Sequence, residues 1–381
     1  MKSLRLILSN SRYFAPAWVF ASINILFGTW AIYIPTIKEK LALDNSDLGI
    51  AIFFLSLGVF TVFPMASALI GRIGVGKATW IGVVASAILA IFPFLATNYY
   101  ALIASLFLFG FANGFTDIAM NTLVTELEKE DKENFMSAAH GFFSLGGVVA
   151  GLGSFLIPKI ENPVLHMLLA MCVVIVVNAL LYKNYIHIKA APIVKESFSF
   201  KVFRPLFILG IISFIIMGSE GAVVDWSSLY LKEVRKAPEN LIGAGFLGFS
   251  ITMTIGRFFA DGISAKIGSL RLVTFGSILA VVGYFLVLQP YLYSTIIGFA
   301  CIGLGLSVII PEMFRIGGTV QGVESSKGVS FIAGTGYSGF LIAPVILGFV
   351  AEKYNLNFIF SILLVSTVLV VFATLLLHGK K

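Results

Sequence analysis

The chain has 381 residues, of which 58% are hydrophobic and 12% are charged, and its mean hydropathy is +0.98. No water-soluble core of this length could hide so much apolar surface, so the composition excludes a soluble globular protein and predicts a polytopic membrane protein. The formal net charge of +7 would indicate a nucleic-acid partner in a soluble protein. Here it is the sum of short loops beside anionic headgroups, and no nucleic acid is expected.

About twelve apolar stretches follow one another along the chain, each long enough to cross a bilayer as a helix. Backbone groups in hydrocarbon must be hydrogen-bonded within the segment, and no alternation of polar and apolar residues indicates barrel strands, so the expected fold is all-α. We place the spans at 14–37, 49–70, 78–96, 99–126, 136–158, 163–183, 204–231, 239–262, 269–288, 291–316, 325–350 and 355–377.

Basic residues are distributed unequally between the two sides of the membrane. An even number of spans puts both termini on one side, together with Lys2, Arg5, Arg12, Arg72, Lys77, Lys183, Lys189, Lys195, Lys201 and Arg204. The positive-inside rule makes that side the cytoplasm. We therefore expect a multi-pass protein of the cell inner (plasma) membrane, with both termini cytoplasmic and no cleaved signal sequence.

The longest internal polar segment divides the spans into six plus six. It predicts an N-terminal six-helix bundle at 1–183, a cytoplasmic linker at 184–203 and a C-terminal six-helix bundle at 204–381. A shift of about 194 residues superposes glycines of one half on glycines of the other: Gly49 on Gly243, Gly74 on Gly268 and, with a closely similar shift, Gly146 on Gly339. We therefore expect two homologous, pseudo-symmetric halves.

A six-plus-six chain with parallel repeats and a basic central loop resembles the major facilitator superfamily over essentially its whole length. The segments Phe27 to Pro35, Asp117 to Asn121, Gly218 to Trp226 and Gly336 to Gly339 resemble the fucose-permease-like branch. The resemblance implies alternating access, with a substrate site at mid-membrane between the two bundles. It also implies that helices one, four, seven and ten line the central cavity.

The superfamily carries the loop signature Gly-x-x-x-Asp-Arg-x-Gly between helices two and three. The matching stretch here keeps Arg72 and Gly74 but lacks the first glycine and the aspartate, and its repeat in the second half contains Lys266. In that second copy Asp261 follows Arg257 by four residues on one helical face, which predicts either an inner-gate latch or an interfacial ion pair. These five residues are the candidate cytoplasmic gate.

Four acids fall on the expected cavity helices: Asp117 on the fourth, Glu220 and Asp225 on the seventh and Glu312 on the tenth. Ionisable residues inside a membrane are costly, so each is a functional candidate. Asp117 or Glu220 could load and release protons as the cavity alternates. The alternative is a fixed hydrogen bond or ion pair, favoured more for Asp225 near the outer end. Glu312 lies three residues before Arg315, which predicts a local salt bridge.

Asp117 and Asn121 lie one turn apart on one helix face, a pair suited to binding hydroxyl groups or passing a proton. The fucose-permease-like branch carries an acid at the place of Asp117, so the resemblance implies a proton-coupling or sugar-binding role. That branch also has an acid on helix one where this chain has Ala31, so its two-acid mechanism is not reproduced. His140, at the start of helix five, is either a partner for Asp117 or a packed interfacial histidine.

Two tryptophans occupy comparable places in the two halves, Trp30 on helix one and Trp226 on helix seven. Their indole rings could stack on a sugar or an apolar ligand, and Tyr230 and Asn24 could add polar contacts. The alternative is packing or interfacial anchoring, which is the commoner role of aromatic residues in membrane helices.

The expected function is secondary active transport of a small polar solute by a monomer in membrane lipid, with protons as the coupling ion. The fucose-permease-like resemblance implies a sugar or a sugar-like compound. Two alternatives stay open: an exporter of a metabolite or an amphipathic drug-like compound, favoured by the aromatic residues and the missing helix-one acid, and a non-transporting sensor of the same fold. We expect no enzymatic activity, no cofactor and no metal, because no recognisable catalytic arrangement occurs.

Overall fold

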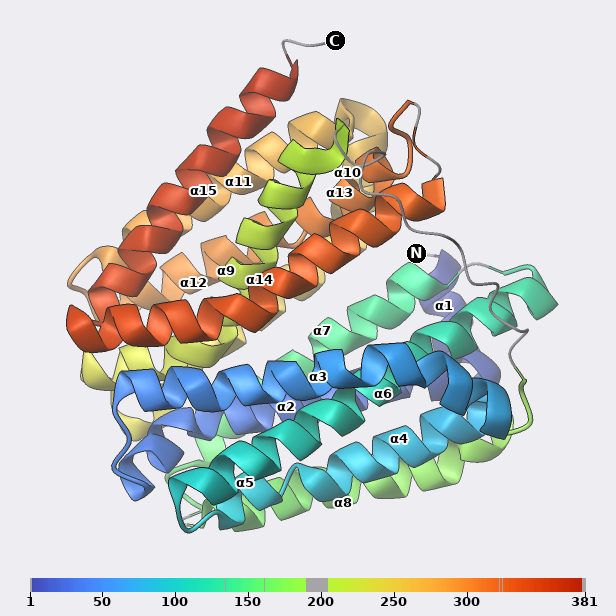
Figure 1. Cartoon of the computed structure of the whole chain (residues 1–381), viewed down its shortest axis with the longest axis horizontal. Helices are drawn as coiled ribbons and strands as arrows, with labels where there is room; N and C mark the ends of the chain where they lie inside the picture. The colour runs from blue at the N-terminus through green and yellow to red at the C-terminus, as the bar shows by residue number, and fades with distance from the viewer. Residues whose placement is uncertain are drawn as a thin grey trace. The chain divides into compact units, whose positions relative to one another are not determined.

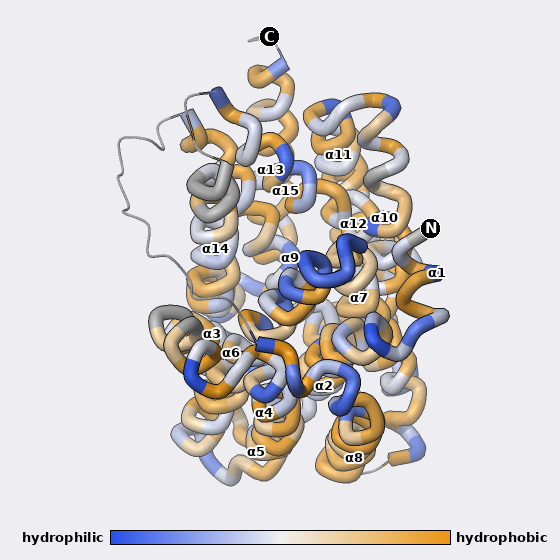
Figure 2. Tube along the Cα trace, turned by 90° about the vertical axis from the view of Figure 1, so that its right-hand side faces the viewer, coloured by the Kyte–Doolittle hydropathy of each residue, from blue (hydrophilic) through white to orange (hydrophobic). Residues whose placement is uncertain are grey.

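The computed structural model describes residues 2–133, 135–160, 162–189, 205–321, 323 and 325–378. This part of the chain is helical and contains no β-strand. Within it, 12 stretches are long and apolar enough to cross a membrane, which confirms the all-α polytopic fold. Figure 2 shows hydrophobic residues along most of the helices and hydrophilic residues mainly at their ends and connections.

The helices of the first half are α1 (Lys2–Ser9), α2 (Ser11–Lys40), α3 (Asn45–Ile73), α4 (Val75–Leu89), α5 (Phe92–Leu95), α6 (Tyr99–Asp131), α7 (Met136–Gly153) and α8 (Pro163–Leu181). Those of the second half are α9 (Phe207–Glu233), α10 (Ala244–Ile267), α11 (Ser269–Leu288), α12 (Leu292–Leu306), α13 (Ile309–Gly317), α14 (Ser325–Lys353) and α15 (Leu356–His378) (Figure 1). The span expected at 269–288 coincides with α11.

Two of the expected spans are each interrupted. The span at 78–96 is divided between α4 and α5, and the span at 291–316 between α12 and α13. A proline within a helix clashes with the carbonyl four residues before it. Pro93 and Pro311 each lie four residues after the point of interruption, at Leu89 and Ser307, so each break has the same local cause.

The chain divides into two compact units. The first comprises Met1–Leu43 and Ala51–Val194, and the second comprises Asp44–Ile50 and Lys195–Lys381. The first turns of α3 thus belong with the second unit. Most of the linker expected at 184–203 lies outside the described residues, which stop at 189 and resume at 205.

Each unit contains the same close helix pair. In the first unit α2 packs against α7, and in the second α9 packs against α14, beside which it runs in Figure 1. A Cβ atom added at Gly146 would collide with the carbonyl oxygen of Ala21, and one added at Gly339 would collide with that of Phe214. The two glycines are 193 residues apart and so are Ala21 and Phe214, so the repeat seen in the sequence recurs as one packing contact.

The turns after α3 and α10 are also alike. Gly74 and Gly268 both have φ of 87°, a left-handed region that strains residues with a Cβ atom. Each glycine ends one helix and begins the next, so the superfamily's loop glycine is required here by backbone geometry alone.

Candidate functional site

In the first unit, the expected Asp117, Asn121 and His140 form one hydrogen-bonded group. The Asn121 side-chain amide donates to the carbonyl oxygen of Asp117 at 2.8 Å and to its carboxyl Oδ1 at 3.2 Å. Asn121 Oδ1 lies 3.1 Å from His140 Nε2. Helix α6 supplies the first two residues at a four-residue spacing, and α7 supplies the histidine, so Asn121 bridges the acid and the base.

The hydrogen bonds fix where protons can be held. Asn121 uses its amide hydrogens on Asp117, so its oxygen accepts, and Nε2 of His140 must carry the hydrogen. Asp117 Oδ2 has no hydrogen-bond partner within the described ranges. Asp117 and Asn121 are half-buried, whereas His140 is exposed. Oδ2 is therefore the atom at which this group can take up a proton or accept a substrate hydroxyl.

Asn24 and Trp30 on α2 make contacts typical of packing. Asn24 donates its amide to the carbonyl oxygen of Phe143 at 2.9 Å, joining α2 to α7. Trp30 is fully buried, and its ring meets Phe94 edge-on at a centroid distance of 6.2 Å. Phe20, also on α2, packs against the His140 imidazole at 5.0 Å and so holds that ring in place.

In the second unit, Glu220 of α9 and Arg257 of α10 form an ion pair, with Oε1 and a guanidinium nitrogen 3.2 Å apart. Both side chains are largely buried, at 15% and 18% exposure. The sequence pattern pairs Arg257 with Asp261 on the same helix, but the side chain of Asp261 lies outside the described residues. The ion pair with Arg257 is the fixed arrangement that was expected for Glu220 as the alternative to proton loading.

We expect Glu220→Gln to destabilise the second unit, because it removes the carboxylate that faces the Arg257 guanidinium. Breaking a fully buried pair costs roughly 3–5 kcal/mol, and partial exposure reduces this to about 2 kcal/mol. Thermal unfolding in detergent measures the loss, with the exposed Glu239→Gln as the control. Glu220→Leu combined with Arg257→Met should recover most of the stability. A double variant as unstable as Glu220→Gln would contradict the ion pair as the cause.

Asp225 and Trp226 lie deep in the second unit, 4% and 0% exposed. Asp225 Oδ1 and Trp226 Nε1 both lack a hydrogen-bond partner in the described part of the chain. The fixed hydrogen bond favoured for Asp225 is therefore not found at Oδ1. An unpartnered buried carboxyl oxygen is costly and usually marks an internal water, a proton or a functional role.

The salt bridge predicted within α13 is present. Both carboxyl oxygens of Glu312 accept from Arg315, at 2.8 and 3.1 Å, and the same guanidinium nitrogen donates to Ser264 of α10 at 2.7 Å. Glu312 is fully buried, whereas 46% of the Arg315 side chain is exposed. This arrangement ties α13 to α10 and leaves Glu312 neutralised.

Tyr230 is fully buried within a polar cluster that the sequence did not reveal. Its hydroxyl donates to Asn357 Oδ1 at 2.7 Å and accepts from Arg235 at 2.7 Å. Arg235 also donates to Thr295 at 2.8 Å and to the carbonyl oxygen of Val287 at 2.8 Å. The cluster joins helices α9, α11, α12 and α15, so Tyr230 holds the bundle together.

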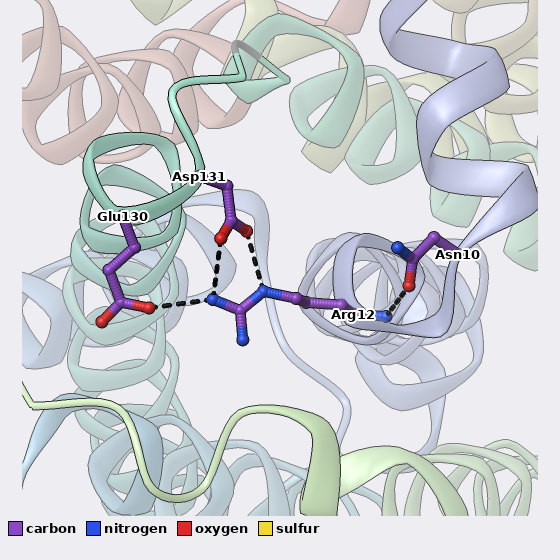
Figure 3. A network of polar contacts seen from close by, with 4 residues as sticks. All are labelled: Asn10, Arg12, Glu130 and Asp131. Atoms are coloured by element: carbon purple, nitrogen blue, oxygen red, sulfur yellow. Dashed lines mark hydrogen bonds and ion pairs between the residues drawn. The ribbon is translucent and has the colours of Figure 1, made fainter.

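Two further contacts of the first unit join residues far apart in sequence. Arg12 donates to both carboxyl oxygens of Asp131, at 2.7 and 3.0 Å, and to Glu130 at 2.8 Å, joining the start of α2 to the end of α6 (Figure 3). The Tyr33 hydroxyl lies 3.0 Å from His166 Nδ1, joining α2 to α8. Periodicity along one helix gives no signal for such pairs.

Arg72 and Lys266 of the candidate gate are exposed, and neither has an ion-pair partner within the described ranges. With Gly74 accounted for by its turn and the Asp261 side chain outside the described residues, the gate stays a prediction.

Comparisons with known proteins agree with this fold. The family model of the Major Facilitator Superfamily matches residues 18–316. An uncharacterized MFS-type transporter of Yersinia pestis is 30% identical over 337 residues, which cover 87% of each chain. Membrane protein MosC of Rhizobium meliloti is 27% identical over 350 residues, covering 90% of this chain and 84% of MosC.

Two kinds of solved transporter share the architecture. The nucleoside transporter NupG matches 98% of this chain and 100% of its own, with a TM-score of 0.74 and 13% identity. A bacterial homolog to the human lysosomal transporter Spinster matches 96% of this chain and 95% of its own, with a TM-score of 0.68 and 12% identity. Such low identities show the fold alone. The homologues and the fold are those of transporters and not of enzymes, and the chain belongs to the major facilitator superfamily.

Proposed function

We propose that the protein takes up a small polar solute by alternating access, coupled to protons, and that Asp117 is the group that carries the proton. The observation that supports this is the chain from Asp117 through Asn121 to His140 in the first unit. It joins a carboxyl, of which one oxygen has no partner among the described residues, to an exposed imidazole, the side chain whose unperturbed pKa lies closest to neutral pH.

A polar substrate suits the same group. Asp117 Oδ2 can accept from a hydroxyl, and the exposed imidazole of His140 offers a further polar edge. The resemblance to the fucose-permease-like branch favours a sugar or a sugar-like compound. Nucleosides also carry a sugar ring, and the structurally similar NupG is a nucleoside transporter, so they belong among the compounds to be tested.

The orientation is part of the proposal. The basic residues at the loops favour the inner membrane, with both termini in the cytoplasm. Fusing a reporter that is active only in the cytoplasm to either terminus tests this directly. Reporter activity at both termini supports the proposed topology. An inactive reporter at both termini would show the opposite orientation in the membrane.

The first test is a thermal-stability screen of the purified protein against sugars, nucleosides, organic acids, amino acids and hydrophobic amines. Each compound that stabilises the wild type is tested again with Asp117→Asn. Stabilisation by a hydrophilic compound supports the proposal, and it should be kept in the variant, whose asparagine resembles the proton-loaded carboxyl. Stabilisation by lipophilic amines alone would favour an exporter instead. A stabilising compound without flux in proteoliposomes would favour a non-transporting sensor.

A further inference from the structure

An apolar groove of about 350 Å³ opens along the second unit between α10 and α11. One wall carries Ile255, Phe259 and Ile263 of α10, and the other carries Leu272, Phe275 and Leu279 of α11. Phe259 and Phe275 are 62% and 61% exposed, so the walls present apolar side chains to the surroundings of the bundle. In a helix that crosses a membrane, such a surface faces lipid chains.

The groove follows from how three helices pack. Helix α12 packs closely on both α10 and α11, whereas α10 and α11 touch each other at few places. Gly256 and Gly276 line the groove without adding a side chain to it. A Cβ atom added at Gly256 would collide with the side chain of Ser307, and one added at Gly276 would collide with the carbonyl oxygen of Gly305. Leu304 and Val308 complete the lining of the groove, and a side chain at either glycine would push the packed segments apart.

Two basic residues stand at one end of the groove. Lys266 follows Ile263 by three residues on α10, and Arg271 precedes Phe275 by four on α11, so each continues the helix face that forms its wall. Both side chains are exposed, and neither has an ion-pair partner in the part of the chain that is described. The basic-residue asymmetry predicts that their loop lies on the cytoplasmic side.

We propose that this groove binds one anionic phospholipid, whose acyl chain lies between α10 and α11 and whose phosphate headgroup contacts Lys266 and Arg271. Apolar walls match the chain, and two exposed cations at the end of the walls match a negatively charged headgroup. A zwitterionic lipid would fill the groove equally well but would gain less from the two cations. This binding does not depend on which solute is transported.

The test measures the binding of phosphatidylglycerol and of phosphatidylcholine with identical chains to the delipidated full-length protein, by native mass spectrometry. We expect phosphatidylglycerol to bind at least about ten-fold more tightly, a preference typical of a paired cationic site. Lys266→Gln with Arg271→Gln should remove this preference. Ile255→Trp, which fills the groove at an exposed position, should weaken both lipids.

The repeat provides a matched control. Arg72 and Lys77 stand 194 residues before Lys266 and Arg271 and are likewise exposed. Arg72→Gln with Lys77→Gln removes the same two charges and should leave phosphatidylglycerol binding to the groove within two-fold. An equal loss in both double variants would show a general attraction of basic loops and overturn the proposal. Equal affinities for the two lipids would also overturn the proposal. Self-association of the delipidated protein that covers the groove would overturn it as well.

Discussion

Asp117→Asn is expected to abolish uphill accumulation of the substrate while leaving the exchange of labelled for unlabelled substrate intact. Asparagine has nearly the same shape as a protonated aspartic acid but cannot release a proton. A transporter that binds its substrate with the proton-loaded carboxyl can then still alternate when loaded, but it cannot complete the empty return step that requires deprotonation. The loss should therefore be specific to coupled transport.

The size of the effect follows from the driving force. A pH gradient of one unit supplies about 1.4 kcal/mol for each proton, which is about ten-fold accumulation for a carrier that moves one proton with each solute. In proteoliposomes with this gradient, the variant should show no net uptake into empty vesicles but should exchange labelled for unlabelled substrate at the wild-type rate in preloaded vesicles. Uptake of a labelled substrate into empty and into preloaded vesicles measures both quantities.

Glu126→Gln is the matched control for this measurement. Glu126 lies on the same helix, nine residues after Asp117, and its carboxyl pairs with Lys129 at 2.8 Å. Nine residues turn an α-helix through two and a half turns, so the two side chains lie on opposite faces. The control should keep wild-type accumulation. Undiminished accumulation by Asp117→Asn would exclude Asp117 as the proton carrier.

The helices themselves could be predicted well because hydropathy is a local property of the chain. The span expected at 99–126 begins where α6 begins, at Tyr99, and ends five residues before Asp131. The two breaks were missed because a window of about nineteen residues averages over a single proline. Pro93 and Pro311 act on one carbonyl each, which hydropathy does not register.

In the candidate site, contacts within one helix could be predicted from the sequence, whereas contacts between helices could not. Glu312 with Arg315, and Asp117 with Asn121, are three or four residues apart on one helix, so the sequence predicted both pairs. Arg257 faces Glu220 of a different helix, a pairing that the sequence did not predict. Such pairing depends on how two helices cross, and a crossing is set by packing over the whole interface.

Packing also explains why the repeat could be seen in only a few residues. Most positions of a membrane helix accept any apolar side chain, so two halves with one fold can differ almost everywhere. Positions where one backbone meets another accept only glycine. Gly146 and Gly339 are such positions, and both lie where a helix approaches the carbonyl of a neighbouring helix.

Gly339→Ala is accordingly expected to destabilise the second unit strongly. The added methyl would collide with the carbonyl oxygen of Phe214 and would lie 3.0 Å from the backbone nitrogen of Gly218, and neither backbone atom can turn aside. Overpacking typically costs about 1–3 kcal/mol, and a clash with backbone belongs at the upper end of that range. Thermal unfolding of the purified protein in detergent, together with the folded yield, measures the loss.

Gly334→Ala on the same helix is the control, because no atom lies within 4 Å of a Cβ atom added there and the residue is exposed. Alanine is a better helix former than glycine by roughly 0.5–1 kcal/mol, so this variant should be as stable as the wild type or slightly more so. Gly146→Ala should behave like Gly339→Ala, because it meets the carbonyl of Ala21 in the first unit. Equal stability of Gly334→Ala and Gly339→Ala would show that α9 and α14 do not approach as closely as described. Loss at both repeat-related glycines would instead establish that each half contains the same close helix contact.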